Sequence, residues 1–171
     1  LSAIGYQILH VGPIGSASIL KVATNYLAST HLVAVGEALM VCKKAGLDLS
    51  NVYEGIKISS GNSFVHETES QVIMNGSYNI NFTMDLVCKD VGLFEKLAQD
   101  LKVPTEVSPL ITKIFSEGRI KYGNRAWSSM IVKRQEDACD ENLRAAGYPE
   151  ELIDDTPRRQ GYEIIPKNVN S

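Results

Sequence analysis

Cysteine, tryptophan and proline are scarce in this chain of 171 residues, which has 3, 1 and 6 of them. The cysteines, Cys42, Cys88 and Cys139, stand far apart, with no CxxC pair and no histidine beside them. Such an odd, scattered set excludes a disulfide framework and a zinc site, so we expect no metal and reduced thiols in a cytoplasmic protein. No charged-then-apolar leader opens the sequence, and we therefore do not expect secretion.

An excess of basic charge is also missing. With 17 Lys and Arg against 20 Asp and Glu, the net charge is −3, which argues against nucleic acid as a partner. A membrane partner is not expected either, because the longest mostly apolar stretch, residues 14–42, is interrupted by four polar side chains: Lys21, Asn25, His31 and Glu37. Hydrophobic residues make up 44% and charged residues 22%, which is typical of a globular domain.

Residues 1–12 contain the one segment that we predict to be a strand. Tyr6 to Val11 alternate loosely between polar and apolar and end at Gly12-Pro13, a turn. No later segment offers a confident partner strand, and no βαβ unit with a GxGxxG loop surrounds the turn. We therefore interpret residues 1–12 as the end of a sheet domain that this chain lacks.

Residues 13–147 have the apolar periodicity of helices, and we predict an all-α domain. One long helix is expected from Ser16 to Ala45, about 45 Å at 1.5 Å per residue. Because it is apolar on more than one face, it should run through the centre of the domain. Shorter helices are predicted to follow, with capping and stop residues at their ends: 48–58, 63–74, 83–101, 109–123 and 128–146. Residues 148–171 have no sustained period and are predicted to form an extended tail.

Lys21 and Asn25 are the first candidates for chemistry. They are four residues apart in the predicted long helix and so project from one face. A lysine among apolar neighbours suits proton transfer because its charged form is disfavoured, and an amide one turn later can hold a substrate oxygen. On spacing alone, a surface lysine beside a solvated asparagine is the commoner explanation.

The residues before Lys21 favour the chemical interpretation. Gly12-Pro13-Ile14-Gly15-Ser16-Ala17 leads through three residues to Lys21 and through three more to Asn25. This GxxGSAxxxKxxxN order resembles the junction between the two domains of the β-hydroxyacid (3-hydroxyisobutyrate-like) dehydrogenases, relatives of 6-phosphogluconate dehydrogenase. The resemblance implies a missing Rossmann domain and a helical second domain of the 6-phosphogluconate-dehydrogenase type. It also implies that Lys21 is the general acid/base and that Asn25 binds substrate. Ala17 departs from the glycine that is often found at its position.

A second segment, about 70 residues later, resembles the same family. Residues 82–93 match its F-x-x-x-x-x-x-K-D-x-G-L pattern, with Phe82, Lys89 and Asp90 at the defining positions. The resemblance implies that Lys89 approaches the nicotinamide of NAD or NADP, and that Phe82 and Asp90 line the substrate pocket. Ser60 and Gly61 lie in a turn that resembles another substrate-side element of the family, although an ordinary turn between helices would look the same.

The family resemblance predicts a function. The chain would be the C-terminal catalytic domain of an NAD(P)-dependent oxidoreductase that interconverts a small 3-hydroxy acid and its semialdehyde or keto form. Lys21, Asn25 and Lys89 should then converge on one cleft within about 10 Å, and the truncated fragment should be inactive. Members of the family pair through their helical domains, so a homodimer or higher homo-oligomer is expected.

Two alternatives remain open from the sequence. One is a helical dimerisation or ligand-binding module without catalysis. The other is an imine-reductase-like relative, against which Lys21 speaks because such relatives lack the catalytic lysine. Neither the hydroxy acid nor the choice between NAD and NADP follows from these residues.

Overall fold

A computed structural model describes residues 5–155, 157 and 159–166. The outer ends of the first and last predicted segments, 1–4 and 167–171, therefore lie outside the described residues. The chain divides into two compact units. One consists of Leu1–Lys21 with Ile153–Ser171 and the other of Val22–Leu152.

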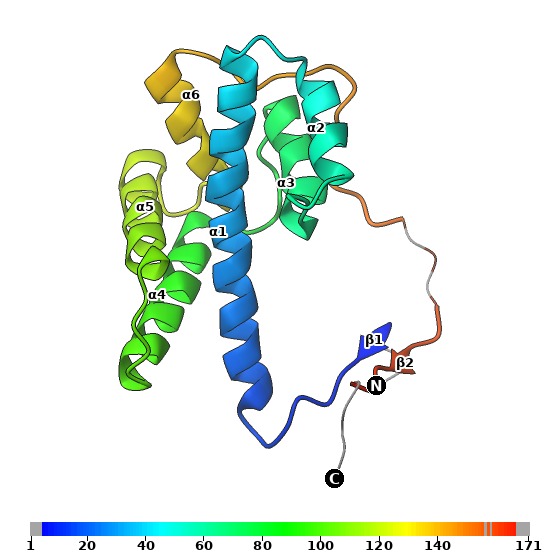
Figure 1. Ribbon diagram of the computed structural model, residues 1–171, viewed down its shortest axis with the longest axis vertical. Coiled ribbons are helices and arrows are strands. Elements are labelled where there is room, and N and C mark those ends of the chain that lie inside the picture. The colour runs from blue at the N-terminus through cyan, green and yellow to red at the C-terminus, as the bar shows by residue number, and fades with distance from the viewer. Residues whose placement is uncertain (1–4, 156, 158, 167–171) are drawn as a thin grey trace. The chain divides into compact units, whose positions relative to one another are not determined.

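Helices account for most of the structure, as the periodicity predicted (Figure 1). The longest is α1, at 29 residues. In chain order the helices are α1 (Ser16–Lys44), α2 (Leu49–Lys57), α3 (Phe64–Asn75), α4 (Met84–Asp100), α5 (Val107–Tyr122), the 3₁₀ helix η1 (Ser128–Val132) and α6 (Lys133–Cys139). No helix in the described part of the chain is both long enough and apolar enough to cross a membrane.

Local capping chemistry explains where α2 and α3 begin and end. The Asp48 side chain accepts a hydrogen bond from the backbone N–H of Asn51, and Ser63 does the same for His66. Each cap satisfies one of the N–H groups that have no partner within a helix. Helix α3 ends at Gly76, whose φ of 94° is left-handed and favours glycine.

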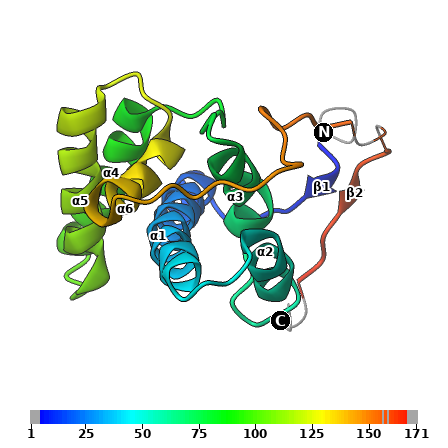
Figure 2. The same ribbon diagram turned by 90° about the horizontal axis from the view of Figure 1, so that it is seen from above.

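Helix α1, from residue 22 onward, is the central element of the second unit. In Figures 1 and 2 it lies between the α2–α3 pair on one side and α4, α5 and α6 on the other. Leu39 is fully buried in α1, and Phe115 is fully buried in α5. Gly36 explains how α1 and η1 approach each other, because a Cβ there would lie 2.7 Å from the side chain of Val132. A glycine that weakens the helix in isolation thus permits close packing.

The last predicted helix, 128–146, was wrong in its extent. Its first five residues form η1, and α6 ends at Cys139, where Asp140 takes a left-handed φ of 48°. The following residues fold back toward the buried carboxylate of Glu136, which accepts hydrogen bonds from the Leu143 backbone N–H at 2.9 Å and from Arg144 at 2.7 Å. Satisfying this buried carboxylate outweighs the continuation of the helix.

The predicted strand has a partner, contrary to expectation. Strand β1 (Gln7–Ile8) pairs in parallel with β2 (Tyr162–Glu163), which lies in the segment predicted to be an extended tail. Backbone bonds run from the Tyr162 N–H to the Tyr6 carbonyl at 2.9 Å and from the Ile164 N–H to the Ile8 carbonyl at 2.8 Å. The tail therefore satisfies part of one edge of the strand.

Candidate functional site

The glycine-rich turn sets the start of α1. Gly12 and Gly15 have φ values of 131° and 100°, which side chains rarely adopt. At Gly12 a Cβ would also meet the Ser16 hydroxyl oxygen at 2.9 Å. The Ser16 N–H donates to the Pro13 carbonyl at 3.0 Å and opens the helix. The backbone of this turn therefore requires glycine at these two positions. Because the turn determines where α1 begins, it also determines the positions of Lys21 and Asn25 along the helix.

Lys21 and Asn25 differ in their surroundings. Lys21 is exposed and belongs to the first unit, whereas Asn25 is half-buried and belongs to the second. They lie four residues apart on the same continuous helix, as predicted. The convergence of Lys21 with Asn25 and Lys89 stays a prediction.

Asn25, Asp90 and Lys89 form a connected group, which we call the Asn25–Asp90–Lys89 cluster. The Asn25 amide N–H donates to Asp90 Oδ2 at 2.5 Å, which ties α1 to α4. Lys89 Nζ lies 3.3 Å from Asp90 Oδ1. The Asp90 side chain is 3% exposed, and that of Lys89 is 58% exposed. A buried carboxylate thus orients both the amide and the ammonium, and their remaining hydrogen-bonding capacity can serve a ligand.

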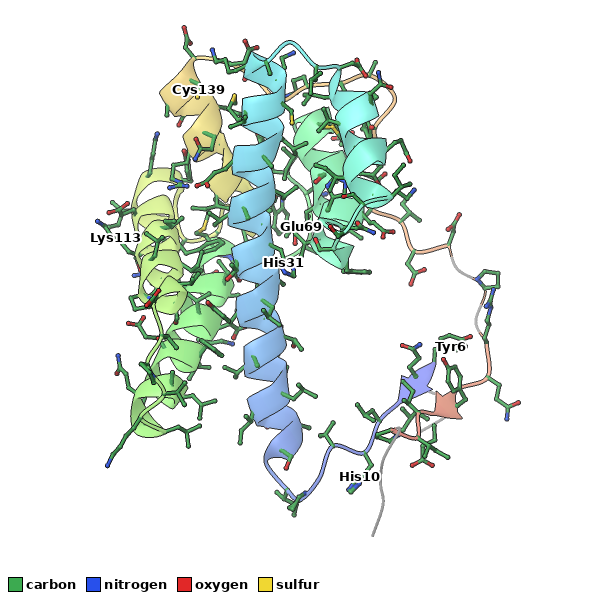
Figure 3. The ribbon with its side chains drawn as sticks, in the orientation of Figure 1. Tyr6, His10, His31, Glu69, Lys113 and Cys139 are labelled. Atoms are coloured by element: carbon green, nitrogen blue, oxygen red, sulfur yellow. The ribbon has the colours of Figure 1, made fainter. Side chains whose placement is uncertain are left out.

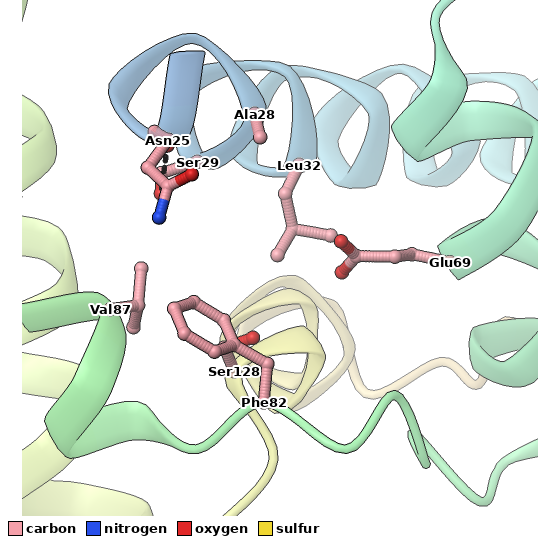
Figure 4. A pocket seen from close by; sticks show the side chains of 8 residues that line it. All are labelled: Asn25, Ala28, Ser29, Leu32, Glu69, Phe82, Val87 and Ser128. Atoms are coloured by element: carbon pink, nitrogen blue, oxygen red, sulfur yellow. Dashed lines mark hydrogen bonds between the residues drawn. The ribbon is translucent and has the colours of Figure 1, made fainter. Parts of the chain in front are cut away.

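A cavity of about 210 Å³ adjoins Asn25 (Figure 4). Its walls come from α1, α3, α4 and the segments around them, and most of the lining is apolar. Eight side chains line it: Asn25, Ala28, Ser29, Leu32, Glu69, Phe82, Val87 and Ser128. Phe82 is among them, and its predicted contact with substrate stays a prediction. The volume suits a small molecule or one end of a larger one.

Glu69 is the cavity residue that the sequence analysis missed. It projects from α3 toward α1 (Figure 3), and its carboxylate points into the space beside Leu32 (Figure 4). Burial raises the pKa of Glu69 to about 8. Among the described residues its Oε2 has no hydrogen-bond partner. The sequence did contain a signal, because Glu69 follows the buried Val65 by four residues and precedes the buried Ile73 by four, which places it on the same face of α3.

Ser60 and Gly61 are exposed in the turn after α2 and do not line the cavity. The Gly61 N–H donates to Ser59 Oγ at 3.1 Å, and the Asn62 N–H donates to the Ser59 carbonyl at 3.2 Å. These bonds are sufficient to explain the turn. A contact of Ser60 and Gly61 with substrate stays a prediction.

The predicted contact of Lys89 with a nicotinamide stays a prediction, and the chemistry of the cluster is compatible with it. Lys89 is held from one side by Asp90, and its exposed ammonium has further N–H donors for a carboxamide or ribose oxygen. Asn25 lies on the other side of Asp90, next to the cavity.

Residues 15–134 match the family model described as the NAD-binding domain of NADP-dependent 3-hydroxyisobutyrate dehydrogenase. The chain belongs to this family. The predicted family and the predicted helical fold are thereby confirmed. The matched range of this 3-hydroxyisobutyrate dehydrogenase-like domain includes Lys21, Asn25, Glu69 and the Asp90–Lys89 pair.

Curated relatives and a solved structure agree with this assignment. The domain is 34% identical over 134 residues to 2-(hydroxymethyl)glutarate dehydrogenase of Eubacterium barkeri, covering 78% of this chain and 44% of the relative. It is 28% identical over 133 residues to L-threonate dehydrogenase of Haemophilus influenzae, covering 77% and 44%. The crystal structure of 3-hydroxyisobutyrate dehydrogenase from Salmonella typhimurium matches with a TM-score of 0.63 at 27% identity, over 70% of this chain and 42% of that one. The chain therefore spans less than half the length of these relatives.

Proposed function

We propose that this domain is the catalytic, substrate-facing part of an NAD(P)-dependent dehydrogenase that interconverts a small 3-hydroxy acid and its semialdehyde or keto form. The observation that carries the proposal is the Asn25–Asp90–Lys89 cluster beside a small, mostly apolar cavity. The relatives named above supply the reaction class, because each is a dehydrogenase. No feature of the described residues selects NAD over NADP.

Each residue of the site has a role that follows from its chemistry. The dinucleotide supplies hydride transfer to or from the carbon that bears the hydroxyl. In oxidation Lys21 takes the hydroxyl proton as the carbonyl forms, and in reduction it returns that proton to the oxygen. Asn25, oriented by Asp90, donates a hydrogen bond to the same oxygen and holds it for proton transfer.

The remaining residues position the reactants. Lys89 donates to the nicotinamide end of the cofactor, and its bond to Asp90 couples that contact to Asn25. Phe82 and Val87 form the apolar wall that shapes the substrate and excludes water. Ser60 and Gly61 would approach the substrate from the turn after α2.

The role of Lys21 is tested by Lys21→Ala in the full-length protein that carries this domain. We expect turnover to fall by at least about 100-fold, because a positioned acid/base contributes roughly 10² to 10⁴ in rate. Dinucleotide affinity should change little, since Lys21 acts on the substrate oxygen. The matched control is Lys113→Ala, whose side chain is 72% exposed on α5. Turnover by Lys21→Ala at the wild-type rate across the pH range would reject the proton-transfer role.

A further inference from the structure

Glu69 differs from Asn25 and Ser29, which also line the cavity. The Ser29 hydroxyl donates to the Asn25 carbonyl at 2.8 Å, and the Asn25 amide donates to Asp90, so both are engaged. Glu69 is the one ionisable side chain among the eight that line the cavity, and its Oε2 is buried without a hydrogen-bond partner in the described part of the chain. A buried carboxyl oxygen without a partner is costly, so its presence in a cavity points to a ligand that completes it.

The chemistry of the cavity restricts what that ligand group is. A carboxyl group accepts hydrogen bonds in either protonation state, so a hydrogen-bond donor on the ligand can complete Oε2. No lysine, arginine or histidine is among the lining residues to neutralise a second anion beside Glu69. Burial favours the neutral form of Glu69 in the empty cavity, and a ligand donor, above all an ammonium, favours the ionised form. Once ionised, Glu69 repels the carboxylate of the substrate, so that carboxylate then lies away from it. The group that faces Glu69 is thus a second polar substituent of the substrate.

We propose that Glu69 is a specificity-determining residue that accepts a hydrogen bond from a hydroxyl or ammonium substituent next to the reacting carbon of the substrate. This inference rests on the proposed function, because Asn25 holds the reacting oxygen at one end of the cavity that Glu69 lines. The apolar walls formed by Leu32, Phe82 and Val87 strengthen the contact, since a hydrogen bond is worth more in a site shielded from water. An alkyl substituent placed at Oε2 would leave this oxygen without a hydrogen bond, because it has no donor.

A ligand series with one variable group tests the proposal. Glycerate, serine and 3-hydroxyisobutyrate share the skeleton HOCH₂–CH(X)–COO⁻, with X as hydroxyl, ammonium or methyl. Their dissociation constants and kcat/KM values are measured with the full-length protein as wild type, Glu69→Gln and Glu69→Met. Glu117→Gln is the matched control, because Glu117 is a solvent-exposed carboxylate on α5 with 58% of its side chain accessible.

The wild type should bind the ligands with a donor substituent more tightly than the methyl ligand. Glu69→Met should lower that preference by about tenfold or more, because the hydrogen-bond acceptor is lost. Glu69→Gln keeps an acceptor but loses the charge, so it should retain preference for the hydroxyl if hydroxyl is the natural donor and lose it if ammonium is. Glu117→Gln should leave all ratios unchanged.

Two results would overturn the inference: a wild-type preference for methyl, or a donor-to-methyl ratio that is unchanged in Glu69→Met. Failure of the proposed function is a separate result, because it would appear as absent turnover with every ligand while the dissociation constants still report on Glu69. Thermal unfolding of each variant shows whether it is folded. If Glu69→Met does not fold, the nearly isosteric Glu69→Gln provides the test. Because Gln cannot ionise, an ammonium-to-methyl ratio that is the same in Glu69→Gln as in the wild type would then overturn the inference.

Discussion

Glu69 links the stability of the domain to pH. Its pKa in the folded protein, about 8, lies above the ordinary value of 4.5 because its carboxylate is buried. The folded state therefore binds the Glu69 proton more tightly than the unfolded state does. The resulting contribution to the free energy of unfolding is fully present only below about pH 4.5. As the pH rises from there through 8, the favourable contribution is lost and the folded state bears the cost of a buried charge.

Glu69→Gln should therefore flatten the pH dependence of stability. Between about pH 5 and 8.5, we expect the free energy of unfolding of the wild type to fall by up to roughly a few kcal/mol. The free energy of unfolding of the variant should fall less. Urea unfolding across this range measures both. Asp137 does not interfere, because its pKa is lowered to about 2 by Lys121 and its contribution is lost only as the pH falls below about 4. An identical slope in wild type and variant would show that Glu69 is solvated.

The contact between Asn25 and Asp90 predicts the effect of a second carboxylate. Asn25→Asp would replace the donor amide by a carboxylate within hydrogen-bond distance of the buried Asp90. Two adjacent carboxylates cannot both ionise at low cost, so the variant should lose about 1–3 kcal/mol of stability at pH 7. It should recover part of that loss near pH 4.5, where the pair can share a proton.

Thermal unfolding at the two pH values measures this change. Asn124→Asp is the control, because Asn124 is exposed. If Asn25→Asp were as stable as the wild type at pH 7, Asp90 would have to be held apart from residue 25 in solution.

At the scale of secondary structure, Gly36 and Gly55 form a matched pair of helical glycines. A Cβ at Gly36 would overlap the Val132 side chain at 2.7 Å, whereas a Cβ at Gly55 in α2 would meet nothing within 4 Å. Alanine is favoured over glycine in a helix by about 1 kcal/mol, but overpacking of a core costs roughly 1–3 kcal/mol. Gly36→Ala should therefore destabilise the domain, and Gly55→Ala should stabilise it.

Chemical denaturation of both variants measures their free energies of unfolding, which should be lower than wild type for Gly36→Ala and higher for Gly55→Ala. Adding Val132→Ala to Gly36→Ala should lessen the overlap and recover part of the loss, because the conflict lies between these two side chains. Equal effects of the two glycine substitutions would mean that η1 does not pack against α1 at this point.

At the scale of the whole molecule, α1 presents a stripe of exposed residues at alternating spacings of three and four. The stripe comprises Leu27, His31, Ala34, Ala38 and Val41, with Leu27 50% and Val41 69% exposed. This is the heptad spacing with which helices pair. It supports the expected homodimer, in which the stripes of two copies would cover each other.

Leu27→Glu should therefore weaken self-association. We expect the wild type to have the mass of a dimer or a higher oligomer at micromolar concentration, and the variant to shift toward one chain, because a charge would be buried at the helix pair. Size-exclusion chromatography with light scattering measures the mass. Ile120→Glu, at an 83% exposed position of α5, is the control. A wild type with the mass of one chain would reject pairing through α1.

The amino-acid sequence was sufficient for those features that depend on residues close together in the chain. The caps at Asp48 and Ser63 and the left-handed glycines at the turn before α1 were predictable because their partners are a few residues away. The same holds for the long helix, and for the family motif that contains Lys21 and Asn25, since both depend on local spacing.

Contacts between distant residues required the folded chain. Asn25 and Asp90 are 65 residues apart, and their hydrogen bond depends on how α1 packs against α4. The break in the last helix depends on the burial of Glu136, and the strand pairing depends on a tail segment 155 residues away from Gln7. Glu69 belongs to this group as well, because the desolvation that changes its chemistry comes from side chains on other helices. Burial and pairing of this kind are properties of packing, which neither a motif nor a periodicity contains.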